Sequence, residues 1–236
     1  MLRTKELTKT VNSQGQDLTI LSDVSLTVNE RDTVAIVGVS GSGKSTLLSL
    51  LAGLDVPSKG EVFLAEQPLH QLDEDERAAV RAQNVGFVFQ SFHLLPGLSA
   101  LENVMLPIEL KEQGEAKKRA TELLEKVGLK ERLHHYPNQL SGGEQQRVAI
   151  ARAFASEPKI LFADEPTGNL DTQNGDKVSD LLFELNQQLG TTLVLVTHDD
   201  RLAERCQRVI RLEGGQVVED GNSASTQSNS AAVGQK

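Results

Sequence analysis

Aromatic residues and positive charge are both scarce in this sequence of 236 residues. Only 3% of the residues are aromatic and none is tryptophan, which argues against a platform on which nucleic-acid bases stack. The formal net charge is -9, whereas affinity for nucleic acid comes largely from Lys and Arg side chains that neutralise phosphates. We therefore expect no nucleic-acid partner.

Cysteines and long apolar runs are also lacking. The single cysteine, Cys206, cannot form an internal disulfide, which is typical of a reducing compartment such as the cytoplasm. No stretch approaches the roughly 18 consecutive apolar residues of a spanning helix, and no apolar signal core follows Met1, Leu2 and Arg3. We expect a chain that neither crosses a membrane nor carries an export signal.

What the chain does contain is a set of short apolar runs that alternate with helical patterns. Such runs are typical of buried parallel strands. They are Val34 to Val37, Val85 to Phe89, Ile160 to Ala163 and Leu193 to Val196. The alternation predicts a doubly wound α/β core, whose ligands lie beyond the carboxyl ends of the strands.

Other segments predict additions to this core. Leu2 to Val28 and Glu61 to Leu64 indicate a small antiparallel β subdomain, and Val209 to Glu219 indicates a hairpin that turns at Gly214 and Gly215.

Between Ser91 and Pro158 only helical patterns occur, such as Ala116 to Val127 and Glu144 to Ala155. From Gly221 onward little can be buried, which favours disorder. We predict an α/β core with the antiparallel subdomain over 1–90 and 158–220, an inserted helical subdomain over 91–157, and a disordered tail over 221–236.

A glycine-rich run after the first core strand indicates a phosphate-binding loop. Its residues match the pattern of Gly, four residues, Gly, Lys and Ser or Thr. They are Gly38, Val39, Ser40, Gly41, Ser42, Gly43, Lys44 and Ser45, with Thr46 next. A strand leads in and an apolar helix, Thr46 to Leu54, leads out, which disfavours a glycine-rich linker. We expect the backbone N–H groups to face phosphates, Lys44 to reach the β and γ phosphates, and Ser45 to ligate magnesium.

Two acids follow another core strand. Asp164 and Glu165 come directly after Ile160 to Ala163, and Pro166 then stops the strand. Alone, such a pair is more often a solvated turn, but the phosphate loop upstream favours a functional role. We expect Asp164 to hold magnesium and Glu165 to orient the attacking water and accept its proton.

Polar residues follow two further core strands. Gln90 comes after Val85 to Phe89, and His198 comes after Leu193 to Thr197. A lone loop histidine is usually a surface residue. Together with the other motifs, however, both residues become candidates for contact with the γ phosphate.

The stretch from Leu140 to Arg147 opens a helix and indicates a second anion site. Ser141 and Glu144 have the spacing of a capping box, which is a sufficient structural explanation for those two residues. Gly142 and Gly143 do not favour a helix, however, and they bare backbone N–H groups where an anion can approach.

Together, these residues closely resemble the ATP-binding subunit of ABC transporters, whose Leu-Ser-Gly-Gly signature the chain carries intact. The resemblance spans almost everything before the tail. It implies a P-loop NTPase (RecA-like) core, hydrolysis of magnesium-ATP, and a head-to-tail homodimer. It further implies a separate multispan membrane permease, which holds the chain on the inner face of the cytoplasmic membrane.

The resemblance also implies roles for individual residues. Those that bind nucleotide and magnesium are Gly38 to Thr46 as the Walker A loop, Asp164 and Glu165 as the Walker B magnesium residue and general base, and Gln90 as the Q-loop residue and a further magnesium ligand. The others are His198 as the switch histidine, Asp171 as the D-loop residue, and Ser141, Gly142 and Gly143 as the motif that contacts ATP held by the opposite subunit.

Finer features resemble the group that powers lipoprotein-releasing and macrolide-exporting permeases. They are Leu94 to Pro96, Leu101 to Val104 and Pro166 to Asn169. One departure concerns the aromatic residue that stacks on adenine in the family, because the matching position here is Val11. Stacking on a base contributes about 1 to 3 kcal/mol, so we expect weaker ATP binding or a relaxed preference for ATP over GTP.

Several alternatives remain open at this point. Leu94 to Pro96 form either an apolar groove for a partner's helix or part of the buried subdomain. A soluble ATPase of translation or DNA repair is opposed by the acidic charge, the single ATPase unit and the lack of a long coiled coil. A binding module without turnover would lack the base, and Glu165 is present.

Overall fold

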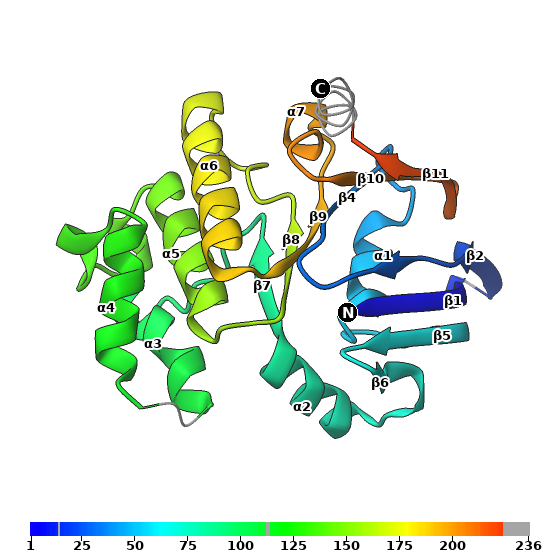
Figure 1. Cartoon of the computed structure of the whole chain (residues 1–236), viewed down its shortest axis with the longest axis horizontal. Coiled ribbons are helices and arrows are strands. Elements are labelled where there is room, and N and C mark those ends of the chain that lie inside the picture. Colours follow the sequence, from blue (N-terminus) through cyan, green and yellow to red (C-terminus); the bar gives the residue numbers. More distant parts are fainter. Residues whose placement is uncertain (14, 112–113, 224–236) are drawn as a thin grey trace, which may run out of the picture. The chain divides into compact units, whose positions relative to one another are not determined.

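The computed structural model describes residues 1–13, 15–111 and 114–223. The chain forms two compact units, one from Met1–Arg81 and Thr192–Lys236 and the other from Ala82–Thr191. Figure 1 labels the α-helices and most of the strands of both units. The subdomain boundaries suggested by the sequence, after residues 90 and 157, remain predictions.

The first unit contains the predicted antiparallel sheet. Its strands follow the order β2-β1-β5-β6, and β3 also pairs with β1. Their bounds are β1 (Leu2–Ser13), β2 (Gln16–Val24), β3 (Thr27–Val28), β5 (Lys59–Leu64) and β6 (Gln67–Pro68). Only part of each long strand is buried: Leu2 and Leu7 on β1 and Leu21 on β2 are fully covered, whereas the hairpin end is exposed. This uneven burial explains the imperfect alternation of apolar residues in the sequence.

Parallel strands form the second sheet segment of this unit. β4 (Thr33–Val37) pairs in parallel with β9 (Thr192–Val196) and with β10 (Arg208–Glu213). β11 (Gln216–Asn222) returns antiparallel to β10 and completes the predicted hairpin. All five residues of β9 and four of β4 are buried, as expected for parallel strands. The predicted disordered tail is wrong at residues 221–222, which belong to β11, while 224–236 lie outside the described residues.

Four helical segments among the described residues belong wholly or mainly to this unit. They are α1 (Lys44–Leu51), η1 (Leu69–Gln71), α2 (Glu74–Asn84) and α7 (Asp200–Ala203). α1 starts before the predicted Thr46 and ends before the predicted Leu54, because Gly53, at φ 71°, turns the chain out of the helix. Cys206, which follows α7, is buried, and burial raises the pKa of its thiol to about 12.

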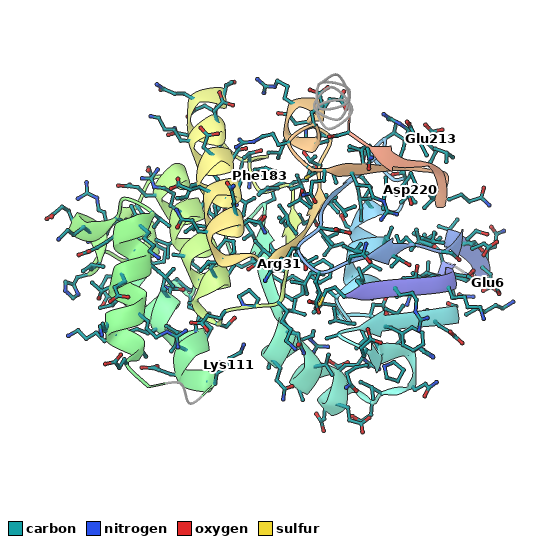
Figure 2. All side chains as sticks on the ribbon, viewed as in Figure 1. Glu6, Arg31, Lys111, Phe183, Glu213 and Asp220 are labelled. Atoms are coloured by element: carbon teal, nitrogen blue, oxygen red, sulfur yellow. The ribbon has the colours of Figure 1, made fainter. Side chains whose placement is uncertain are left out.

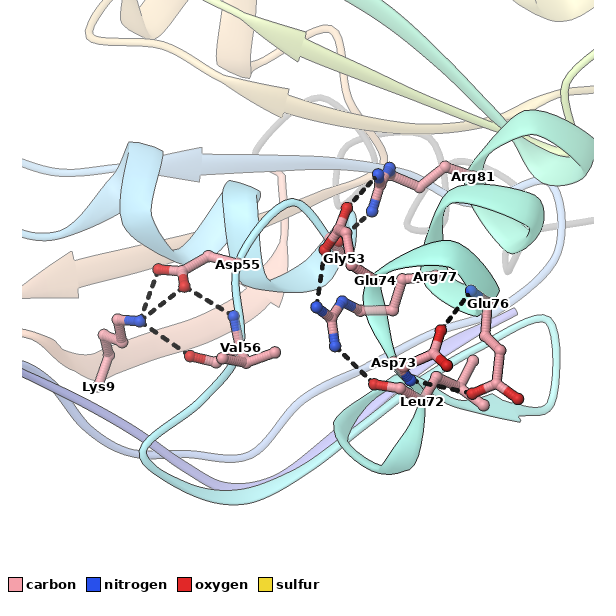
Figure 3. Close-up of polar contacts among 10 residues, drawn as sticks. All are labelled: Lys9, Gly53, Asp55, Val56, Leu72, Asp73, Glu74, Glu76, Arg77 and Arg81. Atoms are coloured by element: carbon pink, nitrogen blue, oxygen red, sulfur yellow. Dashed lines mark hydrogen bonds and ion pairs between the residues drawn. The ribbon is translucent and has the colours of Figure 1, made fainter.

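Charged side chains hold α2, as Figure 3 shows. Asp73 accepts a hydrogen bond from the Glu76 N–H at 2.9 Å and its own N–H donates to the Glu76 carboxylate at 2.9 Å, which forms a capping box. Glu74 lies 2.7 Å from both Arg77 and Arg81, and both guanidinium groups lower the pKa of the Glu74 carboxyl. These contacts stabilise the start of α2, a helix in which most residues are polar or charged.

The second unit combines two parallel strands with helices. β7 (Val85–Phe89) pairs with β8 (Ile160–Asp164), and the helices α3, α4 and α5 contact one another while α5 also contacts α6. The helical bounds are α3 (Ala100–Leu110), α4 (Ala116–Lys126), η2 (Lys130–Arg132), η3 (Pro137–Gln139), α5 (Gly142–Ala155) and α6 (Thr172–Leu189). Lys111, labelled in Figure 2, ends α3 and donates to the Ser156 carbonyl beyond α5 at 2.7 Å. In the described part of the chain, no helix is both long and apolar enough to span a membrane.

Candidate functional site

Glycine shapes the predicted phosphate loop between β4 and α1. Gly38, Gly41 and Gly43 have φ values of 154°, 80° and 98°, which side chains of L residues rarely allow. A Cβ atom on Gly38 would lie 2.2 Å from the Leu212 carbonyl oxygen. The loop can therefore follow this path only with glycine at that position.

The start of α1 leaves its first N–H groups without a side-chain cap. Its N-cap is Gly43, which has no side chain that could accept a hydrogen bond. The first N–H groups of a helix have no partner within the helix, and the helix dipole places partial positive charge there. This helix start is therefore suited to an anion such as a phosphate.

Two further groups of the loop fit a phosphate ligand. The Lys44 ammonium donates to the carbonyls of Gly38 at 2.9 Å and Val39 at 3.0 Å, so the cation lies over the loop itself. The Ser42 hydroxyl is buried and has no hydrogen-bond partner among the described residues, which makes it a donor in need of an acceptor. Ser40 and Ser45 are exposed and Thr46 is half-buried.

His198 lies at the same end of this sheet segment as the loop. It follows β9, and β9 pairs with β4 so that Val196 lies opposite Ile36. The pairing extends to the Thr197 N–H, which donates to the Ile36 carbonyl at 3.3 Å. The chain thus brings the exposed His198 and the phosphate loop to the carboxyl ends of neighbouring strands, as predicted.

In the second unit, the predicted Gln90 and the two acids also follow neighbouring strands. Phe89 and Asp164 are register partners on β7 and β8, so Gln90 and Glu165 each come one residue later. Glu165 has a left-handed backbone, with φ 46°. Asp164 ends β8 and is half-buried, as is Glu165.

Asn169 holds Gln90 in place, a contact that sequence reasoning missed. The Gln90 side-chain amide donates to the Asn169 side-chain oxygen at 3.1 Å, and the Asn169 amide donates to the Gln90 carbonyl at 3.0 Å. Since the Gln90 nitrogen is engaged, the side-chain oxygen is the atom that remains available to a cation. The two residues lie 79 positions apart, and no local pattern signals the contact.

The signature helix α5 begins with the predicted capping box. The Ser141 hydroxyl accepts from the Glu144 N–H at 3.3 Å, and the Glu144 carboxylate accepts from the Ser141 N–H at 2.8 Å. That backbone bond, together with the Ser141 hydroxyl and Arg132, lowers the pKa of the Glu144 carboxyl to about 2. Arg132 lies 3.0 Å away.

Packing within the chain does not require glycine at this helix start. A Cβ atom on Gly142 would meet its nearest neighbours at 3.6 Å, and one on Gly143 would meet Asn174 at 3.4 Å. Both distances correspond to ordinary or nearly ordinary contact. Glycine costs up to about 1 kcal/mol relative to alanine within a helix, so neither packing nor helix propensity explains the two glycines.

The two remaining predicted residues lie in separate units. Asp171 is the N-cap of α6 and accepts from the Asn174 N–H at 2.9 Å, which lowers the pKa of its carboxyl. Val11, on β1, lies opposite Leu18 on β2. Both aliphatic side chains are exposed, at 37% and 53%, so this hairpin presents an apolar face to solvent.

Among the described residues, no cluster of three or more His, Cys, Asp or Glu could hold a metal by itself.

Comparisons with known proteins identify the family of this chain. The family described as ABC transporter matches residues 21–168. The chain is 59% identical over 216 residues to an Escherichia coli K12 protein described as the uncharacterized ABC transporter ATP-binding protein YbbA, covering 91% of this chain and 95% of that protein. It is 52% identical over 217 residues to the lipoprotein-releasing system ATP-binding protein LolD of Idiomarina loihiensis, again covering 91% and 95%.

Solved structures share this architecture. The ATP-binding cassette MJ0796, as a dimer in a post-hydrolysis state bound to ADP and Pi, is 44% identical, with a TM-score of 0.87, and the match covers 94% of this chain and 98% of that chain. A second dimeric structure of MJ0796 is 45% identical, with a TM-score of 0.87 and the same coverage. These neighbours confirm the α/β P-loop NTPase fold class predicted from the sequence.

Proposed function

Because the chain belongs to the ABC transporter family, as a subunit that binds and hydrolyses ATP, we propose that it energises a separate multispan membrane permease of the lipoprotein-releasing or macrolide-export type. Relatives named as lipoprotein-releasing ATPases, 48 to 52% identical over more than nine-tenths of this chain, support that type. The related ABC ATPases work with separate permeases, so an ATPase of translation or DNA repair is not favoured. We further propose that the chain lies peripherally on the cytoplasmic face of the inner membrane.

The uncapped start of α1 is the observation that carries the ATPase role. The proposed nucleotide-binding residues of this loop are Gly38, Ser40, Gly41, Ser42, Gly43, Lys44, Ser45 and Thr46. Lys44 meets the terminal phosphates, and the hydroxyl of Ser45 with the side-chain oxygens of Gln90 and Asp164 would hold Mg²⁺. The mixed hydroxyl, amide and carboxylate set suits this hard cation, which neutralises phosphate charge when bound.

Hydrolysis requires a proton acceptor for the attacking water. We assign that role to Glu165, with His198 and Gln90 as polar contacts of the γ phosphate. Glu165 is half-buried at the end of β8, where solvation is reduced but not abolished.

The proposed working unit is a head-to-tail homodimer. The related cassette structures are dimers, and Gly142 and Gly143 have no packing reason within the chain to be glycine. Ser141, Gly142 and Gly143 would contact ATP held by the opposite subunit, and Asp171 lies in the proposed D-loop.

A rigid, partly apolar segment after Gln90 suits the permease contact. Leu95 is 44% exposed, and Asn103 accepts from the Leu95 N–H at 2.9 Å and donates to the Leu95 carbonyl at 3.2 Å. Arg152 donates to the carbonyls of Phe92 and His93 at 2.9 and 2.6 Å. These bonds hold the backbone while the leucine side chain faces solvent.

Co-purification from native membranes tests the proposal. The full chain should bring down a multispan membrane protein, identified by mass spectrometry, and Leu95→Asp should lose it while retaining ATP hydrolysis. Leu189→Asp is the matched control, because Leu189 is 43% exposed at the end of α6 in the same unit. Capture of ribosomal or repair proteins in place of a membrane protein would overturn the transporter role.

A further inference from the structure

Gln146 is a buried polar side chain with two backbone partners. It lies on α5 with no exposed surface, and burying an amide is unfavourable unless the amide is hydrogen-bonded. Its side-chain nitrogen donates to the Pro166 carbonyl at 2.6 Å and to the Phe89 carbonyl at 3.3 Å. Both partners are acceptors, which fixes the orientation of the amide with its nitrogen toward them.

The two carbonyls belong to the two segments that carry the proposed chemistry. Phe89 directly precedes Gln90, and Pro166 directly follows Glu165. One amide on the signature helix therefore holds the backbone beside the Q-loop glutamine and beside the general base.

Packing alone does not explain a glutamine at this position. The Gln146 side-chain oxygen is buried and has no hydrogen-bond partner among the described residues. An unsatisfied buried acceptor is destabilising, and methionine would fill a similar volume without that cost. The benefit of the amide must come from its two donated bonds.

Glu165 needs an external constraint of this kind. Its backbone is left-handed, at φ 46°, which is unfavourable for a residue other than glycine and persists only where surrounding contacts enforce it. Within its own loop, the Gly168 N–H donates to the Glu165 carbonyl at 3.0 Å. The bond from Gln146 to the Pro166 carbonyl restrains the residue that directly follows Glu165, and the Gln90–Asn169 pair adds a second tie between the two segments.

We infer that Gln146 is a positioning residue for hydrolysis, which holds Glu165 in its left-handed conformation and ties it to the Gln90 segment and the signature helix. The inference rests on the proposed role of Glu165 as general base. Within one subunit, Gln146 thereby links α5, the helix that would contact the partner's nucleotide, to Glu165, the residue that would activate water.

Gln146→Met removes both donated bonds and keeps the size of the side chain. Turnover by the purified full chain should fall on the order of 10- to 100-fold, because small misplacements of a catalytic group have effects of this size. The equilibrium affinity for ATP should stay within about twofold, because phosphate binding depends chiefly on the loop before α1. If Gln146→Met does not fold, Gln146→Glu keeps shape and polarity, loses at least one donated bond, and should lose turnover in the same way.

Asn186→Leu is the matched control for a purely structural role. Asn186 is a second buried amide of the same unit, and it donates to the Thr191 carbonyl. The control should lower the melting temperature but leave turnover per folded molecule near that of the parent. A similar loss of turnover in both variants would overturn the inference.

Glu165→Gln separates this inference from the proposed function. That variant should lose about 100-fold or more in turnover, and adding Gln146→Met to it should produce little further loss, because a residue that acts through Glu165 has nothing left to position. Parental turnover in Gln146→Met, with Glu165→Gln inactive, would overturn the positioning role alone. Near-parental turnover in Glu165→Gln would instead overturn the general-base assignment. Fully multiplicative losses would show that Gln146 acts by another route.

Discussion

The helices α1 and α5 both begin at glycines that we propose to meet phosphate, yet their starts are built in opposite ways. α1 has Gly43 as its N-cap and a lysine as its first residue. α5 has a complete capping box, with Ser141 and the Glu144 carboxylate beside its first turn. A capped start with a nearby carboxylate is the weaker anion site, because some N–H groups are already engaged and the carboxylate repels anions. We therefore expect the loop before α1 to bind nucleotide by itself and the signature helix to add contacts to nucleotide that is already held.

Mixing two inactive variants is the strongest test of whether α1 of one subunit and α5 of the other contact the same nucleotide. Ser141→Arg places a bulky side chain at the start of α5, and Lys44→Ala removes the cation of α1, so each homodimer should be inactive. In mixed dimers both lesions fall on one composite site and the other site is intact. Hydrolysis should recover on mixing, with roughly half of the dimers mixed if pairing is random.

A mixture of Lys44→Ala with the parent chain is the control, since it shows whether dimers with one intact site turn over. If that mixture contains active mixed dimers and the first mixture does not, the composite site is wrong.

Lys44→Ala alone should weaken ATP binding about 10- to 100-fold, because hydrogen bonds to charged groups contribute about 1.5 to 3 kcal/mol. The matched change near α5, Arg132→Ala, should leave the affinity of the isolated chain almost unchanged. Arg132 pairs with Glu144 at the capped start, which we expect to contribute only after nucleotide is bound elsewhere. Calorimetric titration measures both, and equal losses would contradict the comparison.

Val11→Tyr should strengthen binding at the α1 site by about 1 kcal/mol, or roughly fivefold, if adenine lies against the exposed face of Val11 and Leu18. Lys5→Tyr, at an exposed position of the same strand, is the control for a nonspecific effect of an added aromatic ring. Titration with ATP and GTP checks both the gain and the base preference. If Val11→Tyr does not increase the affinity for ATP, the placement of adenine against this hairpin is wrong.

The smallest effect concerns the cap of α5 and its dependence on pH. The pKa of Glu144 is lowered to about 2 in the folded chain from the ordinary 4.5, so the cap stabilises the fold above about pH 4.5, and this stabilisation is lost as the pH falls toward 2. Glu144→Gln should lower stability by at most about 1 kcal/mol at neutral pH. The difference in melting temperature between parent and variant should then narrow on acidification, and a constant difference would contradict the assigned cause.

The sequence predicted well the strands and the helix cap that depend on residues close together in the chain. The four core strands appear within a residue or two of their apolar runs, and the Ser141–Glu144 box lies where its spacing placed it. The helix α2 was missed although Asp73 and Glu76 carry the same capping signal, because few of its residues are apolar and no periodic apolar face marks it.

Contacts between distant residues were not predictable from one sequence. Gln146 reads as one of several polar residues after the signature glycines, and only the fold shows that it is buried against Pro166 and Phe89, 20 and 57 positions away. The same holds for Asn169 and Gln90. The sequence could thus name candidate catalytic residues but not the residues that hold them.

The burial of Cys206 has a practical consequence for studying this protein. Burial raises the pKa of this thiol to about 12, so the reactive thiolate is scarce at neutral pH, and the side chain is also covered. Cys206 of the parent chain should therefore react very little with maleimide dyes. A cysteine introduced at the exposed Leu95 could then be labelled selectively, and its fluorescence would report the arrival of a membrane partner in real time.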